Sequence, residues 1–306
     1  MNDRKAVVTM AHGSGGRAMQ QMIEHMFLSA FDNPWLNERE DGARLSIASL
    51  SAQGDRLAFT TDSYVIDPVF FPGGNIGKLA VCGTANDLAV SGATPAYLSC
   101  GFILEEGFPL EDLQKIVSAM AQTARDAGMA IVTGDTKVVQ RGAADKIFIN
   151  TAGIGVIPIA VNWSAGSIRA GDKVIVSGTL GDHGAAILNL REKLGMDLGV
   201  ESDCAVLAPM IAPLRALSGV HALRDATRGG VNAILHEFSA ASGLGICIDE
   251  NALPVKPAVR GICELLGLEP LNFANEGKLV AVVSAAVEEK VLHLCAATRW
   301  ELMLRR

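Results

Sequence analysis

Four aspartates occupy positions where their carboxylates could act together. Asp62, Asp135 and Asp225 each follow an apolar strand-like run, and Asp87 lies within the small and apolar helical run GTANDLAV. An unpaired carboxylate is costly to bury, so Asp87 needs a partner. Each aspartate alone could cap a helix or a turn. Together they favour Mg²⁺ and a phosphorylated ligand, because Mg²⁺ prefers carboxylate and phosphate oxygens.

Glycine-rich turns accompany these aspartates. The run HGSGG at 12–16 offers unobstructed backbone N–H groups just before a helical run, which suits an anion. SGTLGDHG at 177–184 and DATRGGV at 225–231 follow strand-like runs and open helical ones. FPGGNIGKL at 71–79 is not a P-loop, because the first glycine and the final hydroxyl residue of that motif are missing. We predict nucleotide binding outside the two commonest nucleotide folds.

Other reactive residues carry weaker signals. The six histidines show no HxH or HExxH spacing, and His12 alone adjoins a glycine loop. NEGK at 275–278 is either a turn or a pair of active-site groups, Glu276 and Lys278. The six cysteines show no CxxC spacing and are interpreted as buried reduced thiols.

Composition excludes several classes of protein. The chain has 306 residues, a net charge of −7 and 49% hydrophobic residues, with no basic run for nucleic acid or an acidic membrane surface. No apolar stretch is long enough for a signal core or a membrane span. We therefore expect a cytoplasmic protein of two domains.

The elements that must position these residues follow from hydrophobic periodicity. Strands and helices alternate in part, which predicts an α+β first domain and an α/β layered second domain around a joint at 158–172. The expected strands are 57–66, 97–104, 129–135, 146–157, 173–178, 221–225, 246–249 and 279–284. The expected helices are 76–93, 109–128, 183–194, 203–217, 227–242 and 256–266.

The motifs resemble those of the HypE family of hydrogenase maturation proteins. This family belongs to the PurM-like superfamily of aminoimidazole ribonucleotide (AIR) synthetase and selenophosphate synthetase. The resemblance covers nearly the whole chain to about residue 290. The matching stretches are AHGSGG, TDSYVIDPVFFPGGNIGKLAVCGTANDLAVSGA, GDTKVV, SGTLGDHG, LRDATRGGVN and NFANEGKLV.

The resemblance implies a fold and a reaction. Residues 1–160 would form an ATP-binding domain that pairs with a second copy into a barrel, and residues 171–306 an AIR-synthetase-like domain. A HypF-type carbamoyltransferase would carbamoylate a C-terminal cysteine of this homodimer. The protein would use ATP and Mg²⁺ to dehydrate that S-carboxamide to a thiocyanate. The cyanide would pass to iron on a HypC/HypD-type scaffold.

The resemblance also assigns roles to residues of this sequence. It implies that the Mg²⁺ ligands are Asp62, Asp87, Asp135 and Asp225. It implies that the nucleotide contacts are His12, Gly13, Gly15, Gly16, Asn75, Lys78, Asp135, Asp225 and Gly229. It implies that charge stabilisation and proton transfer fall to Lys137, Glu276 and Asp87.

The last residues depart from the family pattern. The family ends in Pro-Arg-Ile-Cys, whereas this chain ends in CAATRWELMLRR, and Cys295 lies in a different context. Read one frame over, codons for this ending can give a run that resembles the family, so we expect a frameshifted remnant from about Ala296. Loss of the carrier thiol would impair cyanide synthesis, and an incomplete second sheet would expose an unpaired edge.

Two other functions stay open. The chain could be a phosphotransferase like selenophosphate synthetase, although the loop at 12–16 holds no cysteine nucleophile. It could also be a non-catalytic ATP-binding dimer that engages maturation partners.

Overall fold

The first domain is built on a four-stranded sheet with strand order β1-β6-β4-β5. The computed structural model describes residues 6–192 and 199–304, with side chains up to residue 297. β6 pairs antiparallel with both β1 and β4, and β4 pairs parallel with β5. The strands are β1 (Arg56–Tyr64), β4 (Thr94–Glu105), β5 (Ala130–Val139) and β6 (Ile147–Ile157). β1 and β5 are therefore the two edges of this sheet.

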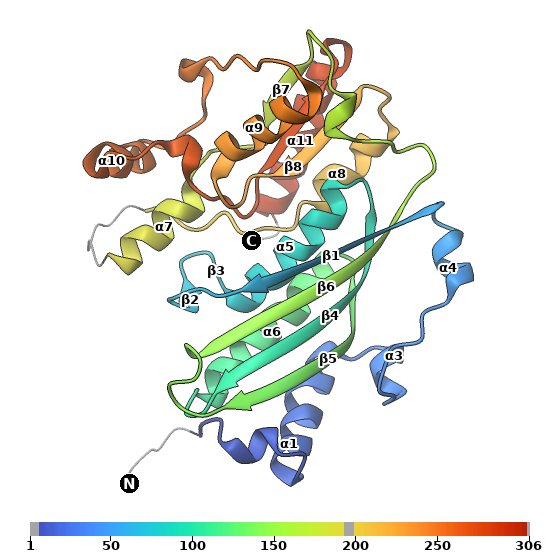
Figure 1. The fold of residues 1–306 in the computed structure, drawn as a ribbon, viewed down its shortest axis with the longest axis vertical. Helices are drawn as coiled ribbons and strands as arrows, with labels where there is room; N and C mark the ends of the chain where they lie inside the picture. Colours follow the sequence, from blue (N-terminus) through green and yellow to red (C-terminus); the bar gives the residue numbers. More distant parts are fainter. Residues whose placement is uncertain (1–5, 193–198, 305–306) are drawn as a thin grey trace.

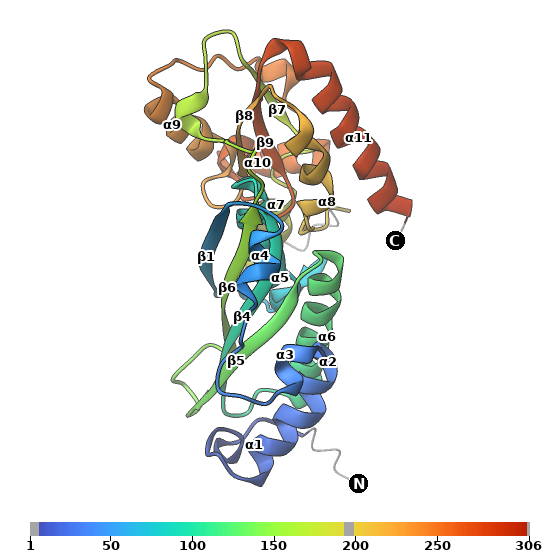
Figure 2. The same cartoon turned by 90° about the vertical axis from the view of Figure 1, so that its right-hand side faces the viewer.

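Two long helices cover one face of the sheet (Figures 1 and 2). α5 (Ile76–Val90) is buried almost all round, as expected for its small and apolar residues. α6 (Leu110–Asp126) is amphipathic and packs its apolar stripe against α5. The opposite face of the sheet carries the alternate residues of each strand and has no labelled helix over it in Figure 2.

Short elements surround this sheet. Those that precede β1 are a 3-10 turn (Met10–Gly13), α1 (Arg17–Met22), a π-type turn (Ile23–Leu28), α2 (Ser29–Phe31), α3 (Pro34–Asn37) and α4 (Ile47–Ser51). The ring centroid of Phe27 lies 4.9 Å from that of Phe102, so the first helices pack on the α6 side of the sheet. A small hairpin, β2 (Phe70–Phe71) and β3 (Gly74–Asn75), leads into α5.

The second domain holds a three-stranded antiparallel sheet, β7-β9-β8. Its strands are β7 (Lys173–Val176), β8 (Val220–Asp225) and β9 (Leu279–Val283). Every residue of β9 is buried, which fits a central strand. The helices are α7 (Asp182–Arg191), α8 (Ala208–Ile211), α9 (Gly230–Ser242), α10 (Pro257–Leu266) and α11 (Glu288–Leu304).

The two domains share one continuous hydrophobic core through α5. One cluster of buried side chains includes Leu88 of α5, Leu207 of the second domain and Val283 of β9. The Asn86 side chain is 1% exposed and bonds to the segment that precedes α8. The second domain is therefore fixed on the helix that carries Asp87.

The α+β class expected from the sequence is confirmed, while some elements differ. The expected helix 203–217 is only α8 and a 3-10 turn (Ala212–Ala216), because Pro213 removes a helical N–H and its ring clashes with the preceding turn. The expected strand 246–249 finds no pairing partner and is not a strand. The end of expected helix 183–194 lies outside the described residues.

The C-terminal expectations concern residues that the structure describes only in part. α11 extends to Leu304, but the side chains from residue 298 lie outside the description, and so does most of the proposed frameshifted run. Among the described residues, β7 pairs with β9 alone, so it forms one edge of the second sheet. No helix in the described residues is long and apolar enough to cross a membrane. The domain limits 1–160 and 171–306 stay predictions.

Candidate functional site

Four carboxyl groups from distant parts of the chain meet at the junction of the two domains. Asp62 comes from β1, Asp87 from α5, Asp225 from the end of β8, and Glu276 from the loop before β9. They line a cleft of about 570 Å³, here called the interdomain cleft. Its other polar lining residues include Ser63, Tyr64, His183, Arg191, Thr227 and Arg228.

Strand alternation and a glycine shape the first-domain side of the cleft. Asp62 and Tyr64 share the helix-covered face of β1, because successive side chains point to opposite faces. The Tyr64 hydroxyl donates to Asp62 Oδ2 at 3.1 Å. Gly83 of α5 allows this approach, because a β-carbon there would overlap the Tyr64 hydroxyl. Thr60 Oγ1 donates to Asp87 Oδ2 at 2.9 Å, which ties the α5 carboxylate to β1.

Antiparallel pairing brings the second-domain carboxyls to the same place. Asp225 lies opposite Leu279 in the β8–β9 register, so the end of β8 adjoins the start of β9. The Ala226 N–H donates to the Lys278 carbonyl at 3.0 Å. Glu276, two residues before Lys278, therefore lies beside Asp225. This part of the site depends on the pairing of segments about 50 residues apart.

Burial and mutual repulsion change the acidity of these groups. Burial, and after it the charge of Asp62, raises the pKa of Asp87 to about 6. Burial, and after it the charge of Asp87, raises the pKa of Asp225 to about 7. The pKa of Glu276 lies well above its usual value, first because it is buried and then because acidic groups surround it. Such a cluster attracts a cation and holds candidate proton-transfer groups.

The raised pKa values of Asp87 and Asp225 predict that the stability of the unliganded protein depends on pH. Between about pH 4 and 7 the folded chain holds protons that the unfolded chain has released, so stability falls as pH rises. We expect Asp87→Asn to stabilise the unliganded protein at pH 7.5 by about 1–3 kcal/mol. Urea unfolding at pH 5 and 7.5 measures this gain, with the exposed Asp41→Asn as the control. A wild type as stable as the variant at pH 7.5 would contradict the prediction.

A second cavity of about 620 Å³ adjoins the interdomain cleft and shares Asp87, Asp225, Thr227 and Arg228 with it. Arg228 thus lines both the interdomain cleft and the second cavity, together with Asp87 and Asp225. Gly229 follows with φ +77°, a left-handed conformation that favours glycine, and α9 begins at the next residue. Cationic and anionic groups together suit a phosphate bound with a metal ion.

The described residues contain no preformed group of three or more acidic, histidine or cysteine ligands that could hold a metal ion. Asp62, Asp87 and Asp225 nevertheless fit a cation. The charge of Asp62 helps to raise the pKa of Asp87, and the charges of both help to raise that of Asp225, so a bound cation would relieve the repulsion among the three carboxylates. The arrangement fits a Mg²⁺ ion held by one or two carboxylates together with phosphate oxygens.

The remaining predicted residues lie elsewhere in the single chain. Asp135 and Lys137 are exposed on β5, where their side-chain N···O distance is 3.5 Å. The strand order places two strands between β5 and β1, so Asp135 is about 14 Å across the sheet from Asp62. Within one chain Asp135 therefore does not lie with Asp62, Asp87 and Asp225, and its role as a Mg²⁺ ligand stays a prediction.

The glycine loop at 12–16 lies beside Asp135 and Lys137, at the β5 edge of the sheet. Gly13 packs on Val138 of β5, where a β-carbon would be in close contact, and Gly15 has φ +78°. His12 Nδ1 accepts from the Thr9 N–H at 3.0 Å, so its ring caps the 3-10 turn. His12, Gly13, Gly15 and Gly16 thus adjoin the β5 edge. Their role as nucleotide contacts stays a prediction.

Asn75 and Lys78 have local structural partners. The Asn75 side chain caps α5 by accepting from the Gly77 and Lys78 N–H groups at 2.9 and 3.0 Å. Lys78 Nζ donates to the Gly73 carbonyl at 2.8 Å. These bonds explain both residues without a nucleotide, and their predicted contacts with one stay untested.

Tyr64, His183 and Arg228 are among the cleft residues that the predicted site did not include. Tyr64 lies in the motif TDSY beside Asp62, and Arg228 lies in DATRGG near Asp225. His183 lies in GDHG, and burial lowers its pKa to about 4, so the ring is neutral. Only adjacency in these motifs could have indicated them, because the cleft itself depends on the domain junction.

Comparison with known families defines the class of this fold and site. Residues 39–157 match the family described as AIR synthase related protein, N-terminal domain. Residues 169–302 match AIR synthase related protein, C-terminal domain. Both halves of the chain are thus AIR synthase related domains, with the interdomain cleft between them.

Closer relatives narrow the assignment. The chain is 70% identical to carbamoyl dehydratase HypE of Escherichia coli K12 over 93% of this chain and 85% of that protein. A crystal structure of the hydrogenase maturation protein HypE in complex with ATP has a TM-score of 0.88 at 46% identity, over 94% and 84% of the chains. A HypE–HypF complex has a TM-score of 0.78 at 48% identity, over 90% and 88%. The chain belongs to the HypE family of carbamoyl dehydratases, which are hydrogenase maturation enzymes.

Proposed function

We propose that the protein uses ATP to dehydrate a protein S-carboxamide to a thiocyanate, from which the cyanide ligand of a [NiFe]-hydrogenase is made. The observation that carries the proposal is the convergence of Asp62, Asp87, Asp225 and Glu276 in one cleft between two AIR synthase related domains. The solved relative described with ATP supports the nucleotide. A cytoplasmic location fits this role and stays a prediction.

The reaction needs one phosphoryl transfer and the loss of two N–H protons. The amide oxygen attacks the γ-phosphorus of ATP, and ADP leaves. Removal of N–H protons lets nitrogen form the C≡N bond while the C–O bond breaks and phosphate leaves. The balance is RS–CO–NH₂ + ATP → RS–CN + ADP + phosphate, without an oxidant or a reductant.

The residues of the cleft suit these steps. The high pKa of Glu276 makes its carboxylate a stronger base than usual, which suits removal of an N–H proton. Asp62, Asp87 and Asp225 would hold Mg²⁺ together with phosphate oxygens, and Arg228 would contact a phosphate. Mg²⁺, when bound, would neutralise charge on the transferring phosphoryl group.

A homodimer would bring Asp135, Lys137 and the glycine loop of one protomer to the interdomain cleft of its partner. The uncovered face of the first sheet exposes apolar side chains, with Leu57 59% and Phe59 72% exposed on the edge strand β1. A two-fold axis parallel to the strands would pack two such faces together and set β5 of one protomer beside β1 of the other. We propose that Asp135, Lys137 and the glycine loop then act in the partner's cleft.

The dimer hypothesis predicts that Phe59→Asp yields a monomer. A carboxylate at position 59 would be buried between the two packed apolar faces without a partner, which opposes association. Sedimentation velocity on the purified protein measures the change. Leu265→Asp, at an apolar side chain that is 65% exposed on α10, should leave the dimer intact. A Phe59→Asp protein that sediments as a dimer would contradict the proposed interface.

The thiol that carries the proposed substrate would have to enter the cleft from elsewhere. None of the six cysteines of this sequence lines the interdomain cleft, and five of them are buried. We propose a HypF-type carbamoyltransferase as the source of the carbamoyl group, by likeness to the HypE–HypF complex, and a HypC/HypD-type iron scaffold as the cyanide acceptor.

One experiment tests the proposed function. The protein is incubated with Mg²⁺, ATP and a peptide that carries an S-carbamoylated cysteine, and mass spectrometry follows the peptide. The expected result is a loss of 18 Da from the peptide, the mass of one water, together with ADP. ATP binding without any dehydration would instead indicate a non-catalytic partner that engages maturation proteins.

A further inference from the structure

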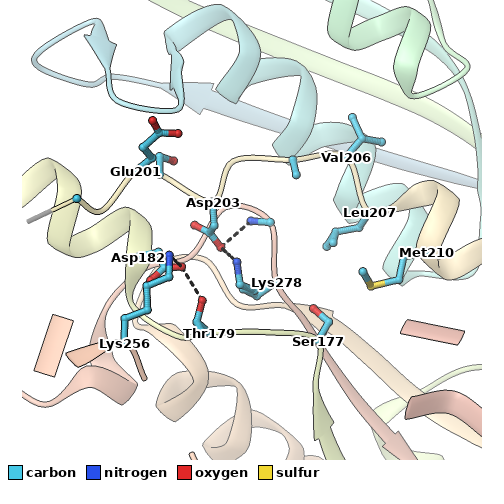
Figure 3. A pocket seen from close by; sticks show the side chains of 14 residues that line it. Ser177, Thr179, Asp182, Glu201, Asp203, Val206, Leu207, Met210, Lys256 and Lys278 are labelled. Carbon is cyan, nitrogen blue, oxygen red and sulfur yellow. Dashed lines mark hydrogen bonds and ion pairs between the residues drawn. The ribbon is translucent and has the colours of Figure 1, made fainter. Parts of the chain in front are cut away.

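Glu276 itself is held through its main chain. Among the described residues, each hydrogen bond recorded for Glu276 uses its N–H or its carbonyl group. Glu276 lines the interdomain cleft, whereas Gly277 and Lys278 line a separate cavity of about 310 Å³. The loop is thus the wall between the cleft and this rear cavity, shown in Figure 3.

Asp203 fastens the loop from the rear cavity. Its Oδ1 accepts from the Glu276 N–H at 3.1 Å, and its Oδ2 accepts from the Gly277 N–H at 3.2 Å. Lys278 Nζ donates to the same Oδ2 at 2.8 Å, in an ion pair whose side chains are 11% and 4% exposed (Figure 3). A β-carbon at Gly277 would overlap the Asp203 carbonyl, so the close approach requires glycine there.

Asn86 fastens the same loop from the first domain. Its Nδ2 donates to the Ala205 carbonyl at 3.0 Å and reaches the Glu276 carbonyl at 3.5 Å, and its Oδ1 accepts from the Leu207 N–H at 2.7 Å. Asn86 directly precedes Asp87 on α5. One buried amide therefore links the helix of Asp87 to the loop of Glu276.

We infer that Asp203 is a positioning residue that holds Glu276 at the cleft for proton transfer, with Asn86 fixing that loop relative to Asp87. The inference rests on the proposed role of Glu276. Asp203 lines only the rear cavity among the described pockets, so it acts through the loop and does not touch the substrate. The ion pair with Lys278 provides this buried carboxylate with a cationic partner, and its two oxygens accept from three donors at once.

The same carboxylate also affects the acidity of Glu276. The pKa of Glu276 is raised first by burial and then by electrostatic interaction with its ionisable neighbours, Cys204, Asp203, Asp225 and Asp62. Removing the Asp203 charge alone leaves the Lys278 ammonium buried behind the loop and should lower that pKa. The groups that face the cleft from the surrounding elements are Asp62, Tyr64, Asp87, His183, Arg191, Asp225 and Arg228.

Three variants separate positioning from general stability. Asp203→Asn removes one charge, whereas Asp203→Asn/Lys278→Met removes both and leaves no buried charge unpaired. Asp182→Asn/Lys256→Met is the matched control, because it removes the other ion pair of the rear cavity, at 2.9 Å, which does not touch the loop. Equilibrium binding of ATP is measured on each.

The double variant at 203 and 278 should lose about 10²-fold in kcat for dehydration, the effect of roughly 1 Å of misplacement, while its Kd for ATP changes little. The control pair should keep both constants. Asp203→Asn should also move the limb of the pH–rate profile that reports Glu276 to lower pH, and the double variant should move it less. Equal losses in both double variants, or a profile unchanged in Asp203→Asn, would overturn the inference.

A readout without turnover keeps the inference separate from the proposed function. Titration of ¹³C-labelled glutamate by NMR follows the Glu276 carboxyl, assigned by its absence in Glu276→Gln. A wild type that titrates at high pH but does not dehydrate the peptide would refute the proposed function and leave the role of Asp203 standing. Identical titration in wild type and Asp203→Asn would refute the role of Asp203.

Discussion

Glu276→Gln is expected to lower kcat for S-carboxamide dehydration by about 10²–10⁴-fold while ATP still binds. Glutamine keeps the shape and the main-chain bonds of the loop, but it cannot accept an N–H proton. Because every recorded bond that holds Glu276 uses its main chain, the loop should stay in place. Phosphoryl transfer precedes proton removal in the proposed sequence, so a single-turnover experiment should still release ADP.

The exposed Glu264 of α10 provides a matched control. Glu264→Gln changes the same functional group at a residue that does not line the cleft and should leave kcat unchanged. Stopped samples analysed by mass spectrometry for peptide and nucleotide measure both products. Glu276→Gln with wild-type turnover would remove Glu276 from the list of proton acceptors.

The second large effect is expected at Asp87. Asp87→Asn should weaken binding of ATP in the presence of Mg²⁺ by roughly 10- to 100-fold, because a charged contact worth about 1.5–3 kcal/mol is lost. The same substitution should stabilise the unliganded protein, as argued above, so a loss of affinity is not explained by unfolding. Titration calorimetry with and without Mg²⁺ separates the metal-dependent part of the binding energy.

The pH dependence of this binding has a defined sign. The pKa values of Asp87 and Asp225 are raised to about 6 and about 7, so acidification from pH 8 to 6 protonates first Asp225 and then Asp87. Mg²⁺-dependent affinity of the wild type should therefore fall over this range. Asp126→Asn, at an exposed position of α6, should behave like the wild type. Unchanged affinity in Asp87→Asn would exclude Asp87 as a metal-side group.

Local sequence patterns predicted most elements of the fold. The α6 segment begins after a proline, has acids in its first turn and ends at Gly128, and the helix spans Leu110–Asp126 as these signals indicate. The failures have local causes that are also visible. Pro213 interrupts the helix expected at 203–217, and the apolar run at 246–249 has no strand beside it to pair with.

The sequence predicted the types of residue in the candidate site, but only some of the residues that form it. Asp62, Asp87 and Asp225 follow or interrupt apolar runs, a pattern that predicts a shared site, and they meet Glu276 in the cleft. Asp135 satisfied the same pattern and lies at the other edge of the sheet. Asp203 carried no motif signal of its own, because its function depends on a loop more than 70 residues away.

The sequence by itself determined the elements, the family and the chemical character of this protein. Its apolar periodicity defines where strands and helices form, and its motifs supply carboxylates beside glycine turns. The tertiary structure alone decided which carboxylates lie together and in which direction their pKa values shift. Strand order and domain docking are non-local, and the raised pKa values of Asp87, Asp225 and Glu276 arise from burial and from charges contributed by distant segments.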